Sequence, residues 1–338
     1  MISKIYDKFI NFIKENYKQL IFLIVFLIVM SFPLDYSVMV SGGTINVNDR
    51  VSIKGEYESD GSYNLAYVTE LKGTIPTVLL SYIIPDWKKI PLEEYKASSN
   101  ESQDDITKRA KIYLKYSEQA AIKLAYLKAY KEFKIKNSEF NIVYVDEKAE
   151  TTLKIGDIIL KANDITITSL EQYRNIVEKS DIGDTINLKI LRDKKEEEAS
   201  IKVKNIDNKK VSGISILELY DYETSPEIEL SFKNNESGSS GGLMLALSIY
   251  DKLISEDLTN GLKIVGTGTV DFDGNVGEID GVEYKLMGAV KQKADLFIVP
   301  TGENYETCLK LKEERGYNIE LIEAKTFDEI IEILRNYK

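Results

Sequence analysis

A serine in a glycine-rich turn, Ser240, is the first residue in the chain whose surroundings suit covalent chemistry. The turn reads S-G-S-S-G-G and runs into apolar residues at helical spacing, which predicts a helix beginning there. Backbone N–H groups in the first turn of a helix have no intrahelical partner, so they can hold an oxyanion. The glycines Gly238, Gly241 and Gly242 allow backbone to approach backbone closely. A flexible linker is the alternative interpretation of this stretch taken alone.

The base that would activate Ser240 cannot be histidine, because the chain contains none. This excludes a Ser-His-Asp triad, and it leaves the single cysteine, Cys308, without a histidine partner. Lysine is the known alternative base for a serine nucleophile. Lys285 lies in a second amphipathic segment, beside the apolar residues Val282 and Leu286, and Asp280 could cap that segment. A lysine beside an apolar stripe is also common on protein surfaces, with its amine in solvent.

Taken together, the two segments resemble the proteolytic domain of the Lon family. That family has a serine in a G-P-S-A-G-like turn and a lysine in a G-G-(L/I)-x-x-K-like segment. Here the turn is G-S-S-G-G and the lysine segment is D-G-V-E-Y-K-L-M-G-A. The segments 266–281 and 295–300 resemble the strands that flank the family's lysine helix. The resemblance covers about 210–338.

The resemblance implies a Ser240–Lys285 catalytic dyad that needs no cofactor and no metal. It implies that Thr267 supports the lysine and that the turn at Gly238, Ser239 and Gly241 supports the serine. Ser239 and Gly241 depart from the family's usual proline and alanine, which bears on the shape of the substrate groove. Lon proteolytic domains commonly assemble as hexameric rings, so a homo-oligomer is an expected partner state.

Composition limits the remaining choices. With 338 residues and 43% hydrophobic content, the chain can form two or three domains with buried cores. Its net charge of −11 argues against nucleic acid as a partner. A four-ligand zinc set cannot be built from one cysteine and no histidine. The absence of a G-x-x-x-x-G-K-[ST] motif removes support for ATP-driven unfolding.

The amino terminus predicts a membrane anchor. Residues 1–19 carry a net positive charge, the segment 20–40 is mostly apolar, and acidic residues dominate afterwards. The positive-inside rule then places 1–19 in the cytoplasm and the bulk of the chain outside a cell membrane that it crosses once. A cleaved signal peptide and a buried helix of a soluble cytoplasmic protein are the alternatives.

The middle of the chain predicts two regions. The first region is 44–139. Alternating apolar residues in 44–72 predict a β-hairpin, and Ile106–Phe133 is predicted to form one long helix. Neither element contains residues to which we assign chemistry. The region 140–206 contains L-K-I-G-D-I-I-L-K-A-N-D-I, a helix with a Ser169–Gln172 capping box, and two strands. It resembles the permuted PDZ domains of bacterial proteases, which implies peptide binding by strand addition. A usual G-L-G-F-type loop is not evident, so a spacer or gate is the alternative role.

We therefore expect an α+β protein with an N-terminal transmembrane helix, a PDZ-like β-rich domain and a Lon-type proteolytic α/β domain at 210–338. The expected function is that of a membrane-anchored, ATP-independent serine endopeptidase. It would hydrolyse protein or peptide substrates outside the cytoplasm, with the PDZ-like domain for substrate binding or gating. The alternative is a membrane-tethered PDZ peptide-binding protein whose Lon-like domain is inactive.

Overall fold

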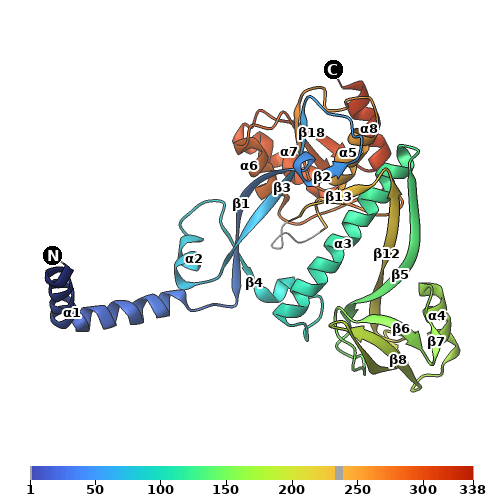
Figure 1. Ribbon diagram of the computed structural model, residues 1–338, viewed down its shortest axis with the longest axis horizontal. Helices are drawn as coiled ribbons and strands as arrows, with labels where there is room; N and C mark the ends of the chain where they lie inside the picture. Colours follow the sequence, from blue (N-terminus) through green and yellow to red (C-terminus); the bar gives the residue numbers. More distant parts are fainter. Residues whose placement is uncertain (1, 233–238, 338) are drawn as a thin grey trace. The chain divides into compact units, whose positions relative to one another are not determined.

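The computed structural model describes residues 2–232 and 239–337 of the chain. Two compact units divide it: residues 1–41 with 69–94, and residues 42–68 with 95–338. Two strands, β1 (Tyr36–Asn46) and β3 (Ser62–Lys72), run through both units (Figure 1).

The first unit is built on the outer parts of β1 and β3. Its other elements are α1 (Ile2–Ser31), α2 (Ile75–Leu80), β4 (Lys88–Pro91) and the start of the short helix η2 (Leu92–Tyr95). The strand β4 pairs antiparallel with β1 over Tyr36–Met39. The helix α2 begins at a capping box in which Thr74 and Thr77 each accept from the other's backbone N–H.

The predicted transmembrane helix is wrong, and with it the predicted single-pass placement in a cell membrane. No helix in the described part of the chain is long and apolar enough to span a bilayer. The uninterrupted apolar run, Leu20–Met30, gives only about 16 Å of helix against a hydrocarbon core of about 30 Å. The helix α1 ends at Ser31, and from Tyr36 the chain enters β1. The last five residues of the predicted span, 36–40, therefore belong to a strand and not to a helix.

A largely parallel sheet forms the centre of the second unit. Its order is β18-β17-β14-β3-β1, and β14 pairs in parallel with both β3 and β17, while β17 pairs in parallel with β18. In chain order, the helices and strands of this part are α5 (Gly242–Leu253), β14 (Lys263–Gly266), α6 (Val282–Lys291), β17 (Leu296–Pro300), α7 (Glu303–Arg315), β18 (Glu320–Ala324) and α8 (Phe327–Asn336).

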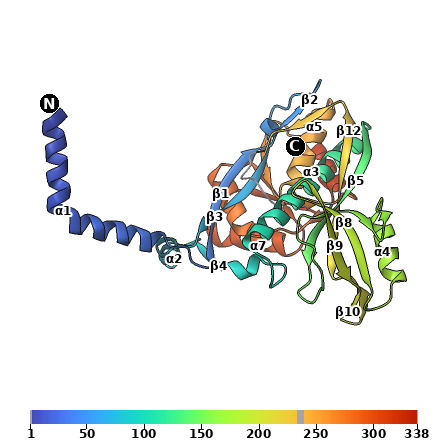
Figure 2. The same cartoon turned by 60° about the horizontal axis from the view of Figure 1, so that its bottom comes forward.

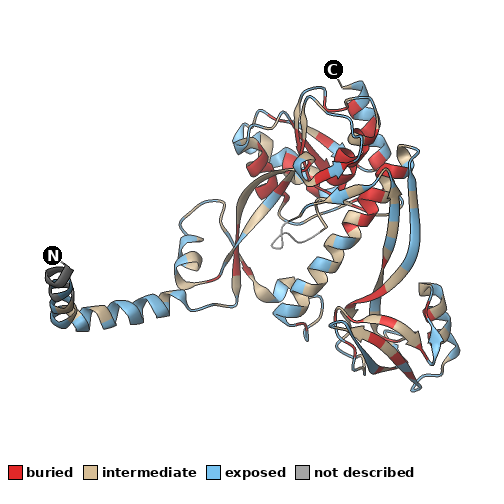
Figure 3. Cartoon of the chain, in the orientation of Figure 1, coloured by how far each residue is buried: buried red, intermediate tan, exposed pale blue. Residues whose placement is uncertain are grey.

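Both faces of this sheet are covered, as alternating side chains require. Ile264 and Ile298 point into a core formed with α3, α5 and α8, whereas the adjacent Val265 and Phe297 point into a core formed with α6 and α7. Buried residues accordingly concentrate along the strands and the inner helix faces (Figure 3). The helix α5 is buried almost throughout, which explains why it is apolar all round.

The long helix α3 (Gln103–Lys128) joins the same core rather than standing apart. It begins at a capping box between Ser102 and Asp105 and buries Ala120, Ala121 and Ile122 against α5. The region predicted as a hairpin and long helix therefore shares one core with the segment that carries Ser240.

A second sheet, with its own core, is inserted between α3 and α5 in the sequence. Its order is β12-β5-β6-β8-β9, with β7 added to β6, and α4 covers its core (Figure 2). The elements are β5 (Glu132–Val145), β6 (Ile158–Ala162), β7 (Ile165–Thr166), α4 (Leu170–Lys179), β8 (Thr185–Arg192), β9 (Lys195–Lys202) and β12 (Ile214–Ser225). The strands β5 and β12 form a long antiparallel ribbon along their whole lengths.

Short elements complete the second unit. They are η1 (Asn48–Arg50), β2 (Val51–Ile53) paired with β13 (Ile228–Leu230), β10 (Lys204–Ile206) paired with β11 (Lys209–Val211), and β15 (Thr269–Val270) paired with β16 (Val276–Gly277). The mixed α/β content that the sequence predicts is therefore present, without the transmembrane component.

Candidate functional site

Ser240 lies in a tight turn directly before α5. Its neighbour Gly241 is the N-cap residue, and the helix begins at Gly242. The carbonyl of Ser239 accepts a hydrogen bond from the Gly242 N–H at 3.2 Å and from the hydroxyl of Ser117, on α3, at 2.9 Å. Ser240 itself is half-buried. The predicted supporting residue Gly238 lies outside the described residues.

The glycine at position 241 is explained by close packing rather than by backbone strain. A β-carbon there would lie 2.7 Å from Leu65 Cδ2, closer than real side-chain contacts. A β-carbon on Gly242 would lie 2.4 Å from the Ser117 hydroxyl. The lack of side chains at these two positions therefore allows the turn to approach β3 and α3 with Leu65 and Ser117 as they lie.

The carbonyl of Ser240 is held by a different segment, the one that directly follows β14. It accepts the Gly268 N–H at 2.8 Å and the Thr267 hydroxyl at 3.0 Å. Thr267 is fully buried and directly follows β14. Both peptide groups that flank Ser240 are thus fixed by partners from other elements.

Lys285 is buried on α6, with only 3% of its surface exposed. Its amine donates to the Thr267 hydroxyl at 3.2 Å. Burial lowers the pKa of Lys285 to about 8, because desolvation penalises the charged amine, while the charge of Asp280 opposes the shift. Asp280 does not cap α6 as predicted; the N-cap is Gly281, in the left-handed conformation at φ 65°.

Thr267 connects the two predicted catalytic residues. Because its hydroxyl proton points to the Ser240 carbonyl, its oxygen can only accept from the Lys285 amine. A neutral amine held in this way keeps its lone pair free for another proton donor. Among the described residues, no hydrogen bond joins the Ser240 hydroxyl to Lys285. The structure therefore brings Ser240, Thr267 and Lys285 together, while their chemical roles stay predictions.

The single cysteine does not compete with this site. Cys308 is fully buried, and desolvation raises the pKa of its thiol to about 12, so the thiolate needed for nucleophilic attack is disfavoured. Within residues 2–232 and 239–337, no cluster of three or more cysteine or acidic side chains is placed to hold a metal ion.

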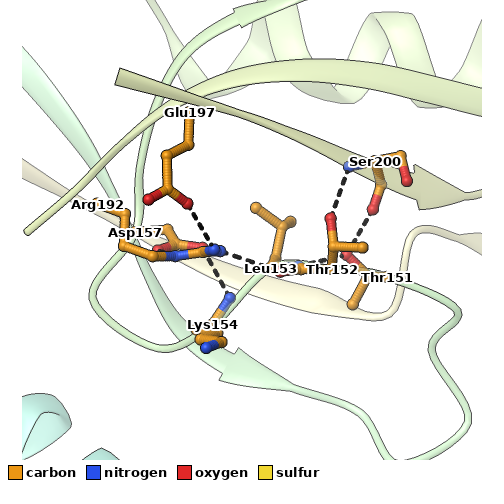
Figure 4. Close-up of polar contacts among 8 residues, drawn as sticks. All are labelled: Thr151, Thr152, Leu153, Lys154, Asp157, Arg192, Glu197 and Ser200. Atoms are coloured by element: carbon orange, nitrogen blue, oxygen red, sulfur yellow. Dashed lines mark hydrogen bonds and ion pairs between the residues drawn. The ribbon is translucent and has the colours of Figure 1, made fainter. Parts of the chain in front are cut away.

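The predicted G-D-x-I-L element lies at the centre of the second sheet's polar anchor. Asp157 is 1% exposed and accepts two hydrogen bonds from the Arg192 guanidinium, at 2.8 and 2.6 Å, and one from the Lys154 N–H at 2.7 Å. Arg192 also donates to Glu197 and to the Thr152 carbonyl (Figure 4). Gly156 supplies the positive φ of 90° that the turn requires.

The helix of this sheet begins as the sequence predicts, with one difference. Ser169 is the N-cap of α4 and accepts the Gln172 N–H at 3.2 Å. The Gln172 side chain accepts from the N–H of Thr168, not from that of the N-cap residue. The reciprocal half of the predicted capping box is therefore displaced by one residue.

Sequence reasoning missed two residues near the site, Ser117 and Gln119. Both lie on α3, to which the sequence analysis assigned no chemistry, and both are 2% exposed. The available signal is that two polar residues interrupt the buried face of an amphipathic helix. Their partners are 122 and 101 residues away in the chain, which local patterns do not reveal.

Comparison with known proteins identifies part of the chain. Residues 131–203 match the PDZ domain family. The PDZ domain of an SdrC-like protein from Listeria innocua is 32% identical, with a TM-score of 0.22, and the match covers 24% of this chain and 92% of that one. The corresponding domain from Listeria monocytogenes is 21% identical, with a TM-score of 0.23, covering 25% and 93%. No curated protein matches the chain.

Residues 131–203 are therefore a PDZ domain, and over this segment the chain belongs to the PDZ family. This confirms the PDZ domain that the sequence analysis placed at 140–206. A PDZ domain suits binding of peptides or proteins, in agreement with the predicted class of partner. The resemblance of 210–338 to the Lon proteolytic domain, and the hexamer that it implies, stay predictions.

Proposed function

We propose that this protein is a serine endopeptidase in which a Ser240–Lys285 dyad hydrolyses peptide bonds and the PDZ domain binds the substrate. The observation that carries the proposal is the burial of the Lys285 amine and the lowered pKa that results. No carboxylate in the described part of the chain makes a hydrogen bond to the buried Lys285 amine, and burial lowers its pKa to about 8, within reach of a general base at neutral pH.

The first step is attack by Ser240. Its hydroxyl oxygen forms a bond to the scissile carbonyl carbon while its proton passes to the neutral Lys285 amine. The N–H groups of Ser240 and Gly241 have no acceptor among the described residues, so they are available to the developing oxyanion. Donors of this kind are worth about 3 kcal/mol each.

The remaining steps follow from proton balance. The Lys285 ammonium returns its proton to the leaving amine as the carbon–nitrogen bond breaks. Water then attacks the acyl-enzyme, with Lys285 again accepting the proton, and Ser240 recovers it on release of the new carboxyl terminus. Thr267 keeps the amine in place throughout, because its oxygen accepts from Lys285.

A serine-reactive fluorophosphonate tests the proposal directly. The wild-type protein should form a covalent adduct at Ser240, located by mass spectrometry, and Ser240→Ala should form none there. Ser248→Ala is the matched control, because Ser248 is a fully buried serine of α5 whose hydroxyl bonds to Asn48 and not to the turn. The control should label at the wild-type rate, and a wild-type protein that forms no adduct would reject the proposal.

A second candidate is a peptide-binding protein whose serine domain is inactive. It is favoured by the absence of a hydrogen bond between Ser240 and Lys285 among the described residues, and by the PDZ domain as the family match. This candidate predicts that the wild type and Ser240→Ala bind peptides with equal affinity and that neither protein hydrolyses them.

A further inference from the structure

Two buried polar side chains on α3 make contacts with different parts of the second unit. Ser117 and Gln119 are two residues apart, so their side chains diverge around the helix rather than sharing one face. Each finds its partner in another element. Such buried polar groups are costly unless their hydrogen bonds are satisfied, and these are.

Gln119 holds the edge of β12. Its amide nitrogen donates to the Tyr220 carbonyl at 2.8 Å, and its amide oxygen accepts the Tyr220 N–H at 2.8 Å. These are the two bonds that a neighbouring strand would make to Tyr220. The two hydrogen bonds therefore fix the position of the Tyr220 backbone, and with it β12, relative to α3.

The strand that Gln119 holds belongs to both cores. At its start, Ile214 and Ile216 pack on the PDZ core, and further along Tyr222 packs on the core that contains α3 and α5. The whole of β12 pairs with β5, so a strand without a chain break connects the two cores. A displacement of the PDZ sheet along the ribbon therefore acts on Tyr220.

Ser117 acts on the candidate nucleophile. Its hydroxyl donates to the Ser239 carbonyl, and in a trans peptide the following N–H points in the opposite direction. Ser117 thus sets the direction of the Ser240 N–H, the group available to an oxyanion. A second contact joins α3 to β12, because the ring of Phe272, in the β15–β16 turn, lies 5.0 Å from the Tyr116 ring on α3 and 5.1 Å from the Tyr220 ring on β12.

We propose that Ser117 and Gln119 are positioning residues that join β12, the strand paired with β5 of the PDZ domain, to the Ser240 turn, so that the reactivity of Ser240 depends on how β12 is held. The inference rests on the proposed peptidase function and adds to it a route between binding and catalysis. Neither residue contacts the Ser240 hydroxyl in the described hydrogen bonds, so both act through the backbone.

The test measures the rate at which diisopropyl fluorophosphate labels Ser240 in the full chain. Ser117→Ala removes one of the two bonds to the Ser239 carbonyl, and a bond of this kind corresponds to about a fivefold lower rate. Gln119→Ala should lower the rate about threefold although it lies outside the turn. The double variant should be no slower than the slower single variant, because the two residues act in series.

Further readouts separate positioning from general damage. Both variants should keep the wild-type unfolding midpoint within a few degrees, lower kcat with KM unchanged, and keep the same apparent pKa in the rate profile. Ser117→Cys retains a weaker donor and should recover part of the rate. Ser248→Ala, the buried serine control, should label as the wild type does.

The outcomes distinguish the two proposals. If Ser240 of the wild type is not labelled, the proposed peptidase function is rejected, whatever the two α3 variants do. Labelling of the wild type with an unchanged rate in Ser117→Ala would reject the positioning role alone. Effects of the two substitutions that simply multiply in the double variant would reject the connection between β12 and the turn.

Discussion

Two ionisable side chains in different parts of the second unit are buried to almost the same extent, yet they differ in the hydrogen bonds that they make. Asp157 in the PDZ domain is 1% exposed and is held by two bonds from Arg192 and one from a backbone N–H. Lys285 on α6 is 3% exposed, and within residues 2–232 and 239–337 its amine makes one hydrogen bond, to the neutral hydroxyl of Thr267. Among these residues the charge of Asp157 is satisfied and that of Lys285 is not.

The difference separates a structural group from a reactive one. A buried charge with complete hydrogen bonding fixes a turn, and removing its partner is costly. A buried charge with incomplete bonding lowers stability and loses its proton more easily, which is what a general base needs. The comparison therefore predicts opposite effects of substitution at the two positions.

The largest expected effect is loss of activity in Lys285→Arg. An arginine keeps the positive charge but cannot release its proton in a protein, so it cannot act as a base. Peptidase activity should fall at least about 10³-fold, to the level of Lys285→Ala and Ser240→Ala, with no further loss in the Lys285→Arg, Ser240→Ala double variant. Activity near the wild-type level in folded Lys285→Arg would mean that the lysine is structural, like Asp157.

The second effect is loss of stability in Arg192→Ala. This change leaves Asp157 buried with only its backbone partner, and such a loss costs about 3–5 kcal/mol. Urea unfolding monitored on the PDZ domain should report it. Lys202→Ala is the control, because its ion pair with Glu150 is about half exposed on both sides and should cost under about 1 kcal/mol. Equal losses of unfolding free energy in the two variants would show that the buried Asp157–Arg192 pair is no more important than a surface ion pair.

The third effect is a gain of stability in Lys285→Met. Folding lowers the pKa of Lys285 from 10.5 to about 8, so the unfolded chain binds the proton more tightly between those values. Wild-type stability should therefore rise with pH across that window and be lowest below pH 8. Methionine has similar length and no charge, so the inactive variant should be about 2–3 kcal/mol more stable at pH 7. If Lys285→Met is less stable than the wild type at pH 7, the burial of Lys285 does not cost the protein stability, and the comparison fails.

The smallest effect is on the pH dependence of the wild-type rate. If neutral Lys285 is the base, kcat/KM should rise about tenfold from pH 7 to pH 9 and then level off, with an apparent pKa near 8. The rate should be followed on a short unstructured peptide, so that binding to folded substrates does not intervene. A flat profile over this range would show that Lys285 does not control the rate.

Much of the candidate site was predictable because its signals are local. The S-G-S-S-G-G stretch, the lysine segment and the G-D-x-I-L element are each short, continuous runs of sequence. The start of α4 at Ser169 also follows from adjacent residues. Predictions of this kind depend on the nearest few residues and on hydrophobic period, which the sequence contains.

The errors and omissions depend on contacts across the chain. The apolar segment at 20–40 combines a short apolar helix end with a strand, and only the pairing of β1 distinguishes it from a longer apolar helix. The burial of Lys285 depends on α6 packing on the sheet, and the partners of Ser117 and Gln119 lie on other elements. Composition and spacing carry no such information, because the same amphipathic helix fits a buried or an exposed lysine.

The long β5–β12 ribbon has a consequence for how the chain folds. Its two strands enclose the rest of the PDZ domain in the sequence, and the Ser117–Ser239 contact bridges 122 residues. Closing a loop of that length from a disordered chain carries an entropic cost that grows with the number of residues enclosed. A PDZ domain that folds first would bring the ends of β5 and β12 together and shorten the effective loop. The inserted domain, once folded, would then reduce the entropic cost of the long-range contacts around it, and pulse-labelled amide exchange should show protection of the PDZ core before that of α5.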